Sequence, residues 1–295
     1  MRVTQMMAKS TILNDMAVAR QNKTNALEQV SSGKRFQRLS DDPAAALDAL
    51  RTRRALQRAE SYTAQSTDAT GWLTTYDTSL GNMSDRMLNV RDLGLQGANT
   101  ATMSADSAST LADEIDATRT EMLSVASTKY LGKPIFSGTS ATTPVYDAAG
   151  AYSGDTGQFL RTVAPGVTMP VNVSGVQAFG TDGSPTQLFA ALSDLATQVR
   201  NQNSPGIVTA LQNLDAARNR IETARIEVGV RYNTVEQITN QRQEGLDSLK
   251  RQLSDAQDID FEKAAIDLNG AETAYQATLA AASRIFSTNL VDYLR

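Results

Sequence analysis

Apolar and polar positions alternate with a helical period over most of the chain. In the clearest run, between Pro43 and about Gly97, apolar or small residues recur at alternating steps of four and three. That spacing aligns the side chains in one stripe along a helix. We expect a helix roughly 80 Å long, because an α-helix rises about 1.5 Å per residue. The stripe consists of Ala55, Ala59, Tyr62, Ser66, Ala69, Leu73, Tyr76, Leu80, Met83, Met87 and Val90.

Both ends of the chain carry further stripes of this kind. Residues 1–31 predict a helix whose apolar positions include Leu13, Met16, Leu27 and Val30. A second terminal helix begins at Phe261, and we expect its apolar seam to pack along a neighbouring helix. The seam consists of Phe261, Ala265, Leu268, Glu272, Tyr275, Leu279, Ala282 and Phe286, followed by Leu290, Val291, Tyr293 and Leu294.

The C-terminal helix gains too little from its own side chains to be stable alone. Burying about eight large side chains contributes roughly 12–24 kcal/mol. Ordering about forty residues costs on the order of 40–80 kcal/mol of backbone entropy, which helical hydrogen bonds offset only in part. The helix therefore needs a partner, either the start of the same chain or another subunit. We favour packing between subunits, because pairing within one monomer leaves the rest of each helix surface uncovered.

Turn and cap residues divide these helices. Ser32 and Gly33 predict the end of the first helix, because glycine readily adopts the left-handed conformation. Asp41, Asp42 and Pro43 predict the start of the long helix, since aspartate caps exposed N–H groups and proline suits the first helical position. The sequence thus predicts a short loop between two helices.

The middle of the chain changes character and then returns to helix. A helix is expected over 111–125, and turn signals with short β-prone runs, such as Phe159–Val163 and Val171–Val173, follow within 139–185. Helical patterns resume over 187–195 and 207–253. We therefore expect a mainly α fold, an elongated antiparallel helical rod with terminal coiled-coil helices and a small β-rich insertion.

Three parts are expected from this order of elements. The terminal polymerisation helices are 1–40 and 256–295, the helical rod is 41–138 with 186–255, and the β-rich insertion is 139–185. The insertion is short enough to be only a lid or knob on the rod.

Composition excludes several classes of function. The chain has no Cys and no His, which excludes disulfides, zinc thiolates and imidazole catalysis. We expect no enzyme activity, cofactor or metal. A net charge of −4 gives no electrostatic basis for binding nucleic acid or an anionic membrane. No apolar run is long enough to span a bilayer and no cleavable secretory signal is evident, so we expect a cytosolic protein or one exported without cleavage.

Paired motifs at the two ends resemble those of flagellins and their hook-associated relatives. The N-terminal pair is Val30–Arg35 and Ser40–Ala45, and the C-terminal pair is Asp258–Phe261 and Ser287–Leu294. The residues carried over from the N-terminal motif are Ser32, Gly33, Asp41, Asp42 and Pro43.

Passages in the middle narrow the resemblance to the hook-associated protein 3 branch, the FlgL-type hook–filament junction proteins. Ile135–Thr139, with Phe136 and Gly138, is similar to that branch's Gly-x-Tyr-x-Phe-(Ala/Ser)-Gly-Thr passage, although here Tyr130 comes before Gly132. Two further passages resemble the turns of its β insertion and its Arg-x-x-x-Gly-x-(Arg/Lys)-x-Asn helix. They are Tyr152–Gly157 with Val171–Gly175, and Arg225–Asn233 with Gly229.

The resemblance implies a structural adaptor in the extracellular bacterial flagellum, exported unfolded through the flagellar type III channel. Its implied partners are the first hook-associated protein on the hook side, flagellin on the filament side, copies of itself and a cytosolic flagellar export chaperone. The implied subunit-packing residues are Leu13, Met16, Leu27, Val30, Phe261, Leu268, Tyr275, Leu279, Phe286, Leu290 and Leu294.

Two alternatives stay open. A filament flagellin would polymerise into long filaments without an adaptor. A helical regulatory binding module would instead be a compact, fully ordered monomer. The basic cluster Arg51, Arg53, Arg54 and Arg58 fits either a solvated helix face or contact with the carboxylates of a neighbouring subunit.

Overall fold

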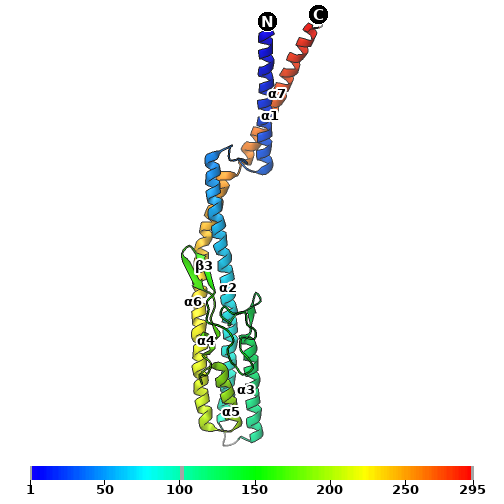
Figure 1. Cartoon of the computed structure of the whole chain (residues 1–295). Helices are drawn as coiled ribbons and strands as arrows, with labels where there is room; N and C mark the ends of the chain where they lie inside the picture. The colour runs from blue at the N-terminus through cyan, green and yellow to red at the C-terminus, as the bar shows by residue number, and fades with distance from the viewer. Residues whose placement is uncertain (1, 100–102, 294–295) are drawn as a thin grey trace. The chain divides into compact units, whose positions relative to one another are not determined.

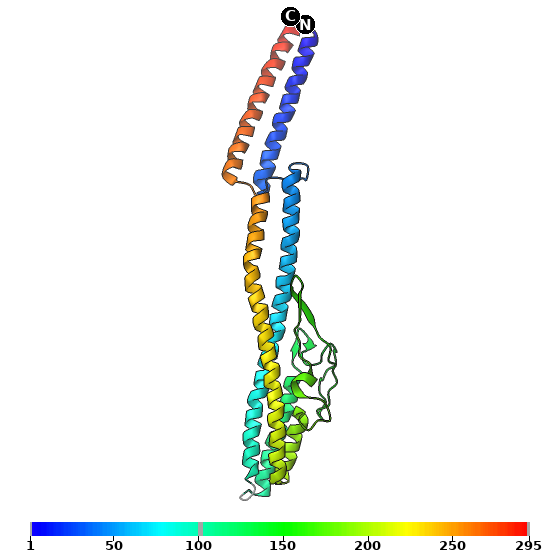
Figure 2. The ribbon, with the colours of Figure 1, turned by 90° about the vertical axis from the view of Figure 1, so that its left-hand side faces the viewer.

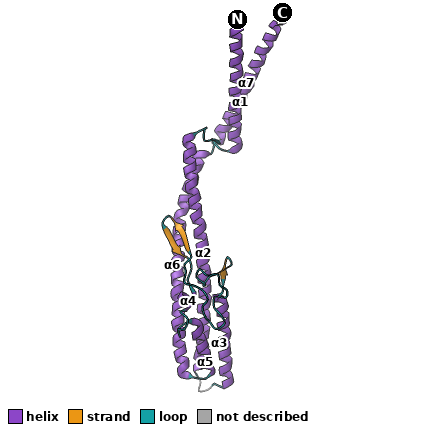
Figure 3. Ribbon diagram, in the orientation of Figure 1, coloured by secondary structure: helices purple, strands orange, loops and turns teal. Residues whose placement is uncertain are grey.

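The computed structural model describes residues 2–99 and 103–293, and this part of the chain is mainly helical (Figures 1 and 3). The expected mainly α class with small antiparallel sheets is confirmed. The elements in chain order are α1 (Arg2–Ser32), α2 (Pro43–Ala98), α3 (Ala105–Ala126), β1 (Lys129–Tyr130), β2 (Lys133–Pro134), β3 (Leu160–Ala164), β4 (Val167–Pro170), α4 (Gly175–Phe179), α5 (Leu188–Arg200), α6 (Ser204–Gln257) and α7 (Phe261–Tyr293).

Packing divides the chain into two compact units. The first contains residues 1–58 and 245–295, and the second contains residues 59–244. Residues 139–185 pack within the second unit and contribute Val145, Val163 and Phe179 to its core. The three-part division expected from the sequence stays a prediction, and the two units are described separately below.

The core of the second unit is built along the stripe of α2. Leu73, Tyr76, Leu80, Met83 and Met87 are fully buried there. The stripe packs with α3, α5 and α6, and α3 and α5 lie side by side (Figures 1 and 2). Both methionines therefore fill the core, as the helical spacing indicated.

Two antiparallel hairpins lie on this unit. In the longer one, β3 pairs with β4, from Leu160 opposite Pro170 to Ala164 opposite Val167. The strand expected at Val171–Val173 is wrong, because β4 ends at Pro170 and the backbone hydrogen bonding to the partner segment ends one residue later, with Val171 N donating to Phe159 O at 2.9 Å. Val171 and Val173 are fully buried in the core, and the Asn172 side chain accepts from Phe159 N at 2.7 Å and donates to Gly157 O at 2.8 Å.

A very short hairpin joins β1 to β2 through Leu131 and Gly132, whose φ values are +48° and +80°. Turns of this kind favour Asn-Gly or Gly-Gly, because both residues adopt positive φ. A leucine in the left-handed conformation costs roughly 1–2 kcal/mol. The Leu131 side chain is also 78% exposed, so its packing within the chain does not offset that cost.

Aromatic rings fill the space between the helices and the β-rich segment. The Phe136 ring lies 4.7 Å from the Phe179 ring and 5.2 Å from the Tyr76 ring. Tyr146 lies 4.7 Å from Phe189, and its hydroxyl is buried without a hydrogen-bond partner among the described residues. By contrast, the Tyr152 hydroxyl lies 2.9 Å from Phe136 O and 2.7 Å from Asp155 O.

Gly138 and Asp155 close the loop that follows Phe136. Gly138 has a φ of +70°, and a Cβ atom there would lie 2.1 Å from Asp155 O, so the position requires glycine. The Asp155 carboxylate accepts from Thr139 N and Gly157 N, each at 2.7 Å, and from the Thr139 hydroxyl at 2.8 Å. These hydrogen bonds, the one from Thr139 N first, lower the pKa of Asp155.

Gly229 lies in the interior of α6 without a close neighbour. A Cβ atom at this position would meet nothing within 4 Å. Glycine in a helix interior costs about 1 kcal/mol relative to alanine. Packing within the described chain therefore does not require glycine at this position.

Candidate assembly surface

Helices α1 and α7 of the first unit lie side by side (Figure 2). Ala26, Ala264 and Ala282 are buried, with exposed fractions of 9%, 7% and 3%. Lys23 Nζ lies 3.2 Å from the Glu272 carboxylate, but both side chains are more than a third exposed, so this ion pair contributes little. The pair is consequently held by a thin apolar contact.

Large apolar side chains lie on the outside of the same two helices. Burying one such side chain fully contributes about 1.5–3 kcal/mol, so the exposed set is an unused source of binding free energy on the order of 10 kcal/mol. Leu13 and Leu27, two heptads apart, share one face of α1, and exposed apolar surface of this kind marks interaction sites. The exposed fractions are Met7 66%, Leu13 55%, Val18 51%, Leu27 51%, Phe261 63%, Ile266 65% and Leu279 41%.

The predicted packing residues fall into three groups. The first group, half-buried along the pair, contains Met16, Val30, Leu268 and Tyr275, whereas the second, exposed group contains Leu13, Leu27, Phe261 and Leu279. The third group lies outside the described residues: this applies to Leu294 and to the side chains of Phe286 and Leu290.

At the start of α7 the residues buried against α1 are offset from the predicted seam, and packing of that seam against other subunits stays a prediction. Ala264 is buried there, whereas Ala265 and Phe261 are exposed. The seam was counted from Phe261 as its first large apolar residue. The side of α7 that faces α1 instead contains Ala264 and Ala282, which are buried, with Leu268 and Tyr275 half-buried between them.

The loop between α1 and α2 is fixed by backbone hydrogen bonds to the segment before α7. Gly33 has a φ of +69°, and its N–H donates to Gln29 O at 2.9 Å, which ends α1 as predicted. Arg35 N donates to Gln257 O at 2.7 Å, and Ile259 N donates to Gly33 O at 3.1 Å. These two hydrogen bonds form a short ladder, at which α1 ends and shortly after which α7 begins.

The caps expected at the start of α2 are present. Asp42 Oδ1 accepts from Ala45 N at 3.0 Å, and Pro43 is the first helical residue. Asp41 Oδ2 accepts from Arg38 N at 3.0 Å, and this hydrogen bond is the main reason why the pKa of Asp41 is lowered. The two aspartates thus hold the loop rather than forming an acidic site.

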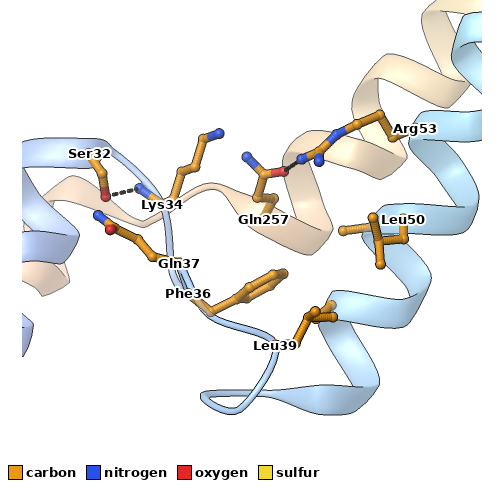
Figure 4. Close-up of a pocket in the computed structure, with 10 residues that line it drawn as sticks. Ser32, Lys34, Phe36, Gln37, Leu39, Leu50, Arg53 and Gln257 are labelled. Atoms are coloured by element: carbon orange, nitrogen blue, oxygen red, sulfur yellow. Dashed lines mark hydrogen bonds between the residues drawn. The ribbon is translucent and has the colours of Figure 1, made fainter.

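A groove of about 560 Å³ with both apolar and polar walls lies beside this loop (Figure 4). Phe36, Leu39 and Leu50 line it, and the Arg53 guanidinium donates to Gln257 Oε1 at one side. Leu39 is 61% exposed, and Leu47 on the first turns of α2 is 52% exposed. Unsatisfied apolar surface therefore continues from the helix pair to the start of α2.

Both ends of the chain match regions of a known protein family. Residues 3–141 match the bacterial flagellin N-terminal helical region, and residues 211–294 match the bacterial flagellin C-terminal helical region. Together these two matches cover most of the sequence. The chain belongs to the bacterial flagellin family.

Relatives within the flagellin family include both a hook-associated protein and a flagellin. The flagellar hook-associated protein 3 of Escherichia coli strain K12 is 27% identical over 274 residues, covering 85% of this chain and 86% of its own. A flagellin of Bacillus subtilis strain 168 is 24% identical over 276 residues, covering 89% of each. The crystal structure of FlgL from Bacillus cereus shares the fold, with a TM-score of 0.62 and 20% identity, and the match covers 69% of this chain and 99% of that one.

The other flagellin-like motif residues lie in the second unit. Phe136 is fully buried, Gly138 forms the tight loop with Asp155, and Gly229 is in α6. No helix of the described chain contains an apolar stretch of the length that a bilayer requires. Within residues 2–99 and 103–293, no cluster of three or more acidic side chains has the arrangement of a metal site.

Sequence reasoning missed part of the exposed apolar surface. Met7, Val18 and Ile266 were left out because only strict steps of four and three were counted. Leu39 and Leu47 lie next to the loop, where no helical period applies. No local signal distinguishes the first three, because each directly follows an apolar or small residue in the sequence.

Proposed function

We propose that this flagellin-family protein is a structural axial subunit of the bacterial flagellum that assembles through the outward faces of α1 and α7. The observation that carries the proposal is the thin contact within the pair: among its described residues only alanines are buried apolar ones, and the large apolar residues are half-buried or exposed. A pair built in this way gains most of its apolar burial from neighbouring subunits. The groove beside Phe36 extends the same surface.

Within the flagellum, we propose that the protein joins the hook-side hook-associated protein to the flagellin filament. Support comes from the hook-associated protein 3 of Escherichia coli, which matches 85% of this chain. Lateral neighbours would be copies of the same chain, and the neighbours along the axis would be the first hook-associated protein and flagellin. The Bacillus subtilis flagellin, at lower identity, keeps filament flagellin as the second candidate.

The exposed apolar face of α7 also supports a need for protection before export. Phe261, Ile266 and Leu279 would favour aggregation in the cytosol if they stayed uncovered. A cytosolic export chaperone that covers this region until the chain enters the type III channel would prevent that. We include such a chaperone, and export without a cleavable signal, in the proposal.

The proposal is tested by changing outward residues in the bacterium that carries this chain. Leu13→Ser with Leu27→Ser should leave the helix pair folded, since both side chains are more than half exposed. Filaments should then detach from hooks, and flagellin should appear in the medium. A matched control is Gln21→Ser with Asn25→Ser, which changes exposed polar residues of the same helix.

Normal motility and full retention of filaments in the Leu13 and Leu27 variant would contradict the assembly role of this face. Electron microscopy of the purified wild-type chain separates the two candidate functions. Long filaments formed by the chain alone would favour filament flagellin over the adaptor.

A further inference from the structure

The second unit has a hollow on its surface between α2 and α6. It has a volume of about 360 Å³ and is lined by Leu73, Thr74, Asp77, Gly229 and Asn233, among others. Ile226 and Val230, on the adjacent turns of α6, are 67% and 60% exposed. The hollow has apolar residues exposed on the neighbouring turns of α6, and its volume is large enough for a leucine side chain.

Gly229 keeps this hollow open. Any larger residue would occupy part of the space, and alanine or leucine would also favour the helix. The described chain does not use the space, because no atom approaches the position of a Cβ atom within 4 Å. A contact from outside the chain would account for glycine here.

The β1–β2 hairpin of the same unit has the complementary shape. Leu131 projects at its tip with 78% exposure and a φ of +48°, where asparagine or glycine would be less strained. Lys129 and Lys133 flank it and are exposed. The tip is therefore an apolar knob between two positive charges.

Charge complementarity connects the knob to the hollow. Arg225 Nε donates to Asp77 at 2.8 Å, and Glu222 and Asp85 also lie close enough to interact with Arg225 electrostatically. Asp77 is the charged residue among those that line the hollow, and its side chain is 51% exposed, so its carboxylate can accept a further cation. Lys129 beside Leu131 matches that charge, whereas the Lys133 ammonium lies 5.2 Å from the Phe159 ring of its own chain.

We propose that the Leu131 hairpin of one copy of this chain seats in the Gly229 hollow of the next copy. The inference rests on the proposed function, in which copies lie side by side. Tyr130 packs against α2 at Gly71, and the hollow is lined by Leu73 to Asp77 of the same helix, so knob and hollow lie at a similar height. Gly71 and Leu73 are about 200° apart around the helix, so the two features face in different directions. A contact between two different patches continues from copy to copy, as a ring or helical layer requires.

Cysteine cross-linking tests the contact directly, because the natural chain has no Cys. Leu131→Cys and Asn233→Cys are made in separate full-length copies, and both are expressed in the bacterium that carries this chain. Isolated flagella are then oxidised, and covalent dimers that contain one copy of each variant are expected. The control pairs Leu131→Cys with Val208→Cys, a half-exposed α6 residue outside the hollow, and should yield about tenfold less dimer.

Two outcomes distinguish a failure of this contact from a failure of the proposed function. If filaments stay attached to hooks and the Leu131–Asn233 pair yields no more dimer than the control, the knob-and-hollow contact is wrong and the proposed function stands. If the chain is absent from isolated flagella, the proposed function is wrong and the contact falls with it.

A pair of stabilising substitutions gives an independent readout. Gly229→Leu fills the hollow and Leu131→Asn relieves the turn, so each should raise the Tm of the isolated chain. Each should nevertheless reduce the number of attached filaments. Gly245→Leu is the matched control, since Gly245 also lies in α6 with nothing within 4 Å of a Cβ atom; it should raise the Tm without losing filaments. Full filament retention in both the Gly229 and Leu131 variants would overturn the contact.

Discussion

The buried hydroxyl of Tyr146 provides a sharp test of the packing of the second unit. Tyr146 is 2% exposed and its hydroxyl has no partner among the described residues, whereas the Tyr152 hydroxyl contacts two carbonyl oxygens. An unsatisfied buried hydroxyl costs about 1–3 kcal/mol, and a satisfied one contributes about 1 kcal/mol. We therefore expect Tyr146→Phe to stabilise the unit by about 1 kcal/mol and Tyr152→Phe to destabilise it by a similar amount.

The single tryptophan of the chain makes the assay specific to this unit. Trp72 is 2% exposed and lies 5.1 Å from the Tyr130 ring, so its fluorescence reports unfolding of the core. Urea and thermal unfolding followed at Trp72 should move in opposite directions for the two variants. For a unit of this size, 1 kcal/mol corresponds to a Tm shift of about 2–4 °C.

The result that would refute the reasoning is a loss of stability in Tyr146→Phe equal to that in Tyr152→Phe. That result would mean that the Tyr146 hydroxyl has a hydrogen-bond partner, such as an ordered water. Tyr62→Phe is a control, because this tyrosine is only partly buried, and its ring, which stacks with Arg242, is retained in the variant.

The remaining predictions concern pH and one glycine. Burial raises the pKa of Tyr152 to about 12 from 10.0, so stability should fall as pH rises from about 10 to 12, and Tyr152→Phe should reduce that slope in alkaline titrations followed at Trp72. Because the pKa of Asp155 is lowered, its ionised carboxylate stabilises the folded state at pH values above the ordinary pKa of 3.8, and this stability is lost as the pH falls below that value. Asp155→Asn should reduce this loss, as measured by urea unfolding at acidic pH. Gly33→Ala, at a φ of +69°, should destabilise the first unit by roughly 1–2 kcal/mol, measured by hydrogen exchange at Arg35 N, with Gly245→Ala as the control.

The long α2 stripe could be predicted from the sequence because one face is buried along much of its length. Leu73, Leu80 and Met87 follow the same steps without a break, and the structure buries all three. Gly33 and Asp42 were equally predictable, since each acts through its own backbone or a neighbour within a few residues. Sequence patterns therefore predict those features whose contacts lie within the same helix or loop.

Features that depend on distant partners could not be predicted. Trp72 is buried only because Tyr130 and Phe159 cover it, and neither follows from the period of α2. The groove at Phe36 depends on how residues 33–42 lie against α2 and Gln257. The phase of α7 depends on which face of α1 it meets, and alanine stripes give no hydropathy signal strong enough to show that.

The alanine contact between α1 and α7 has a consequence for transport. Because the buried apolar residues between the two helices are alanines and larger ones, such as Leu268 and Tyr275, are only half-buried, separating the helices exposes limited apolar surface. In the export route that we propose, each helix would therefore pass through the channel as a single strand of chain and pair again afterwards. The stable contact would then be the one formed after export, with the neighbouring subunits that cover Leu27 and Phe261.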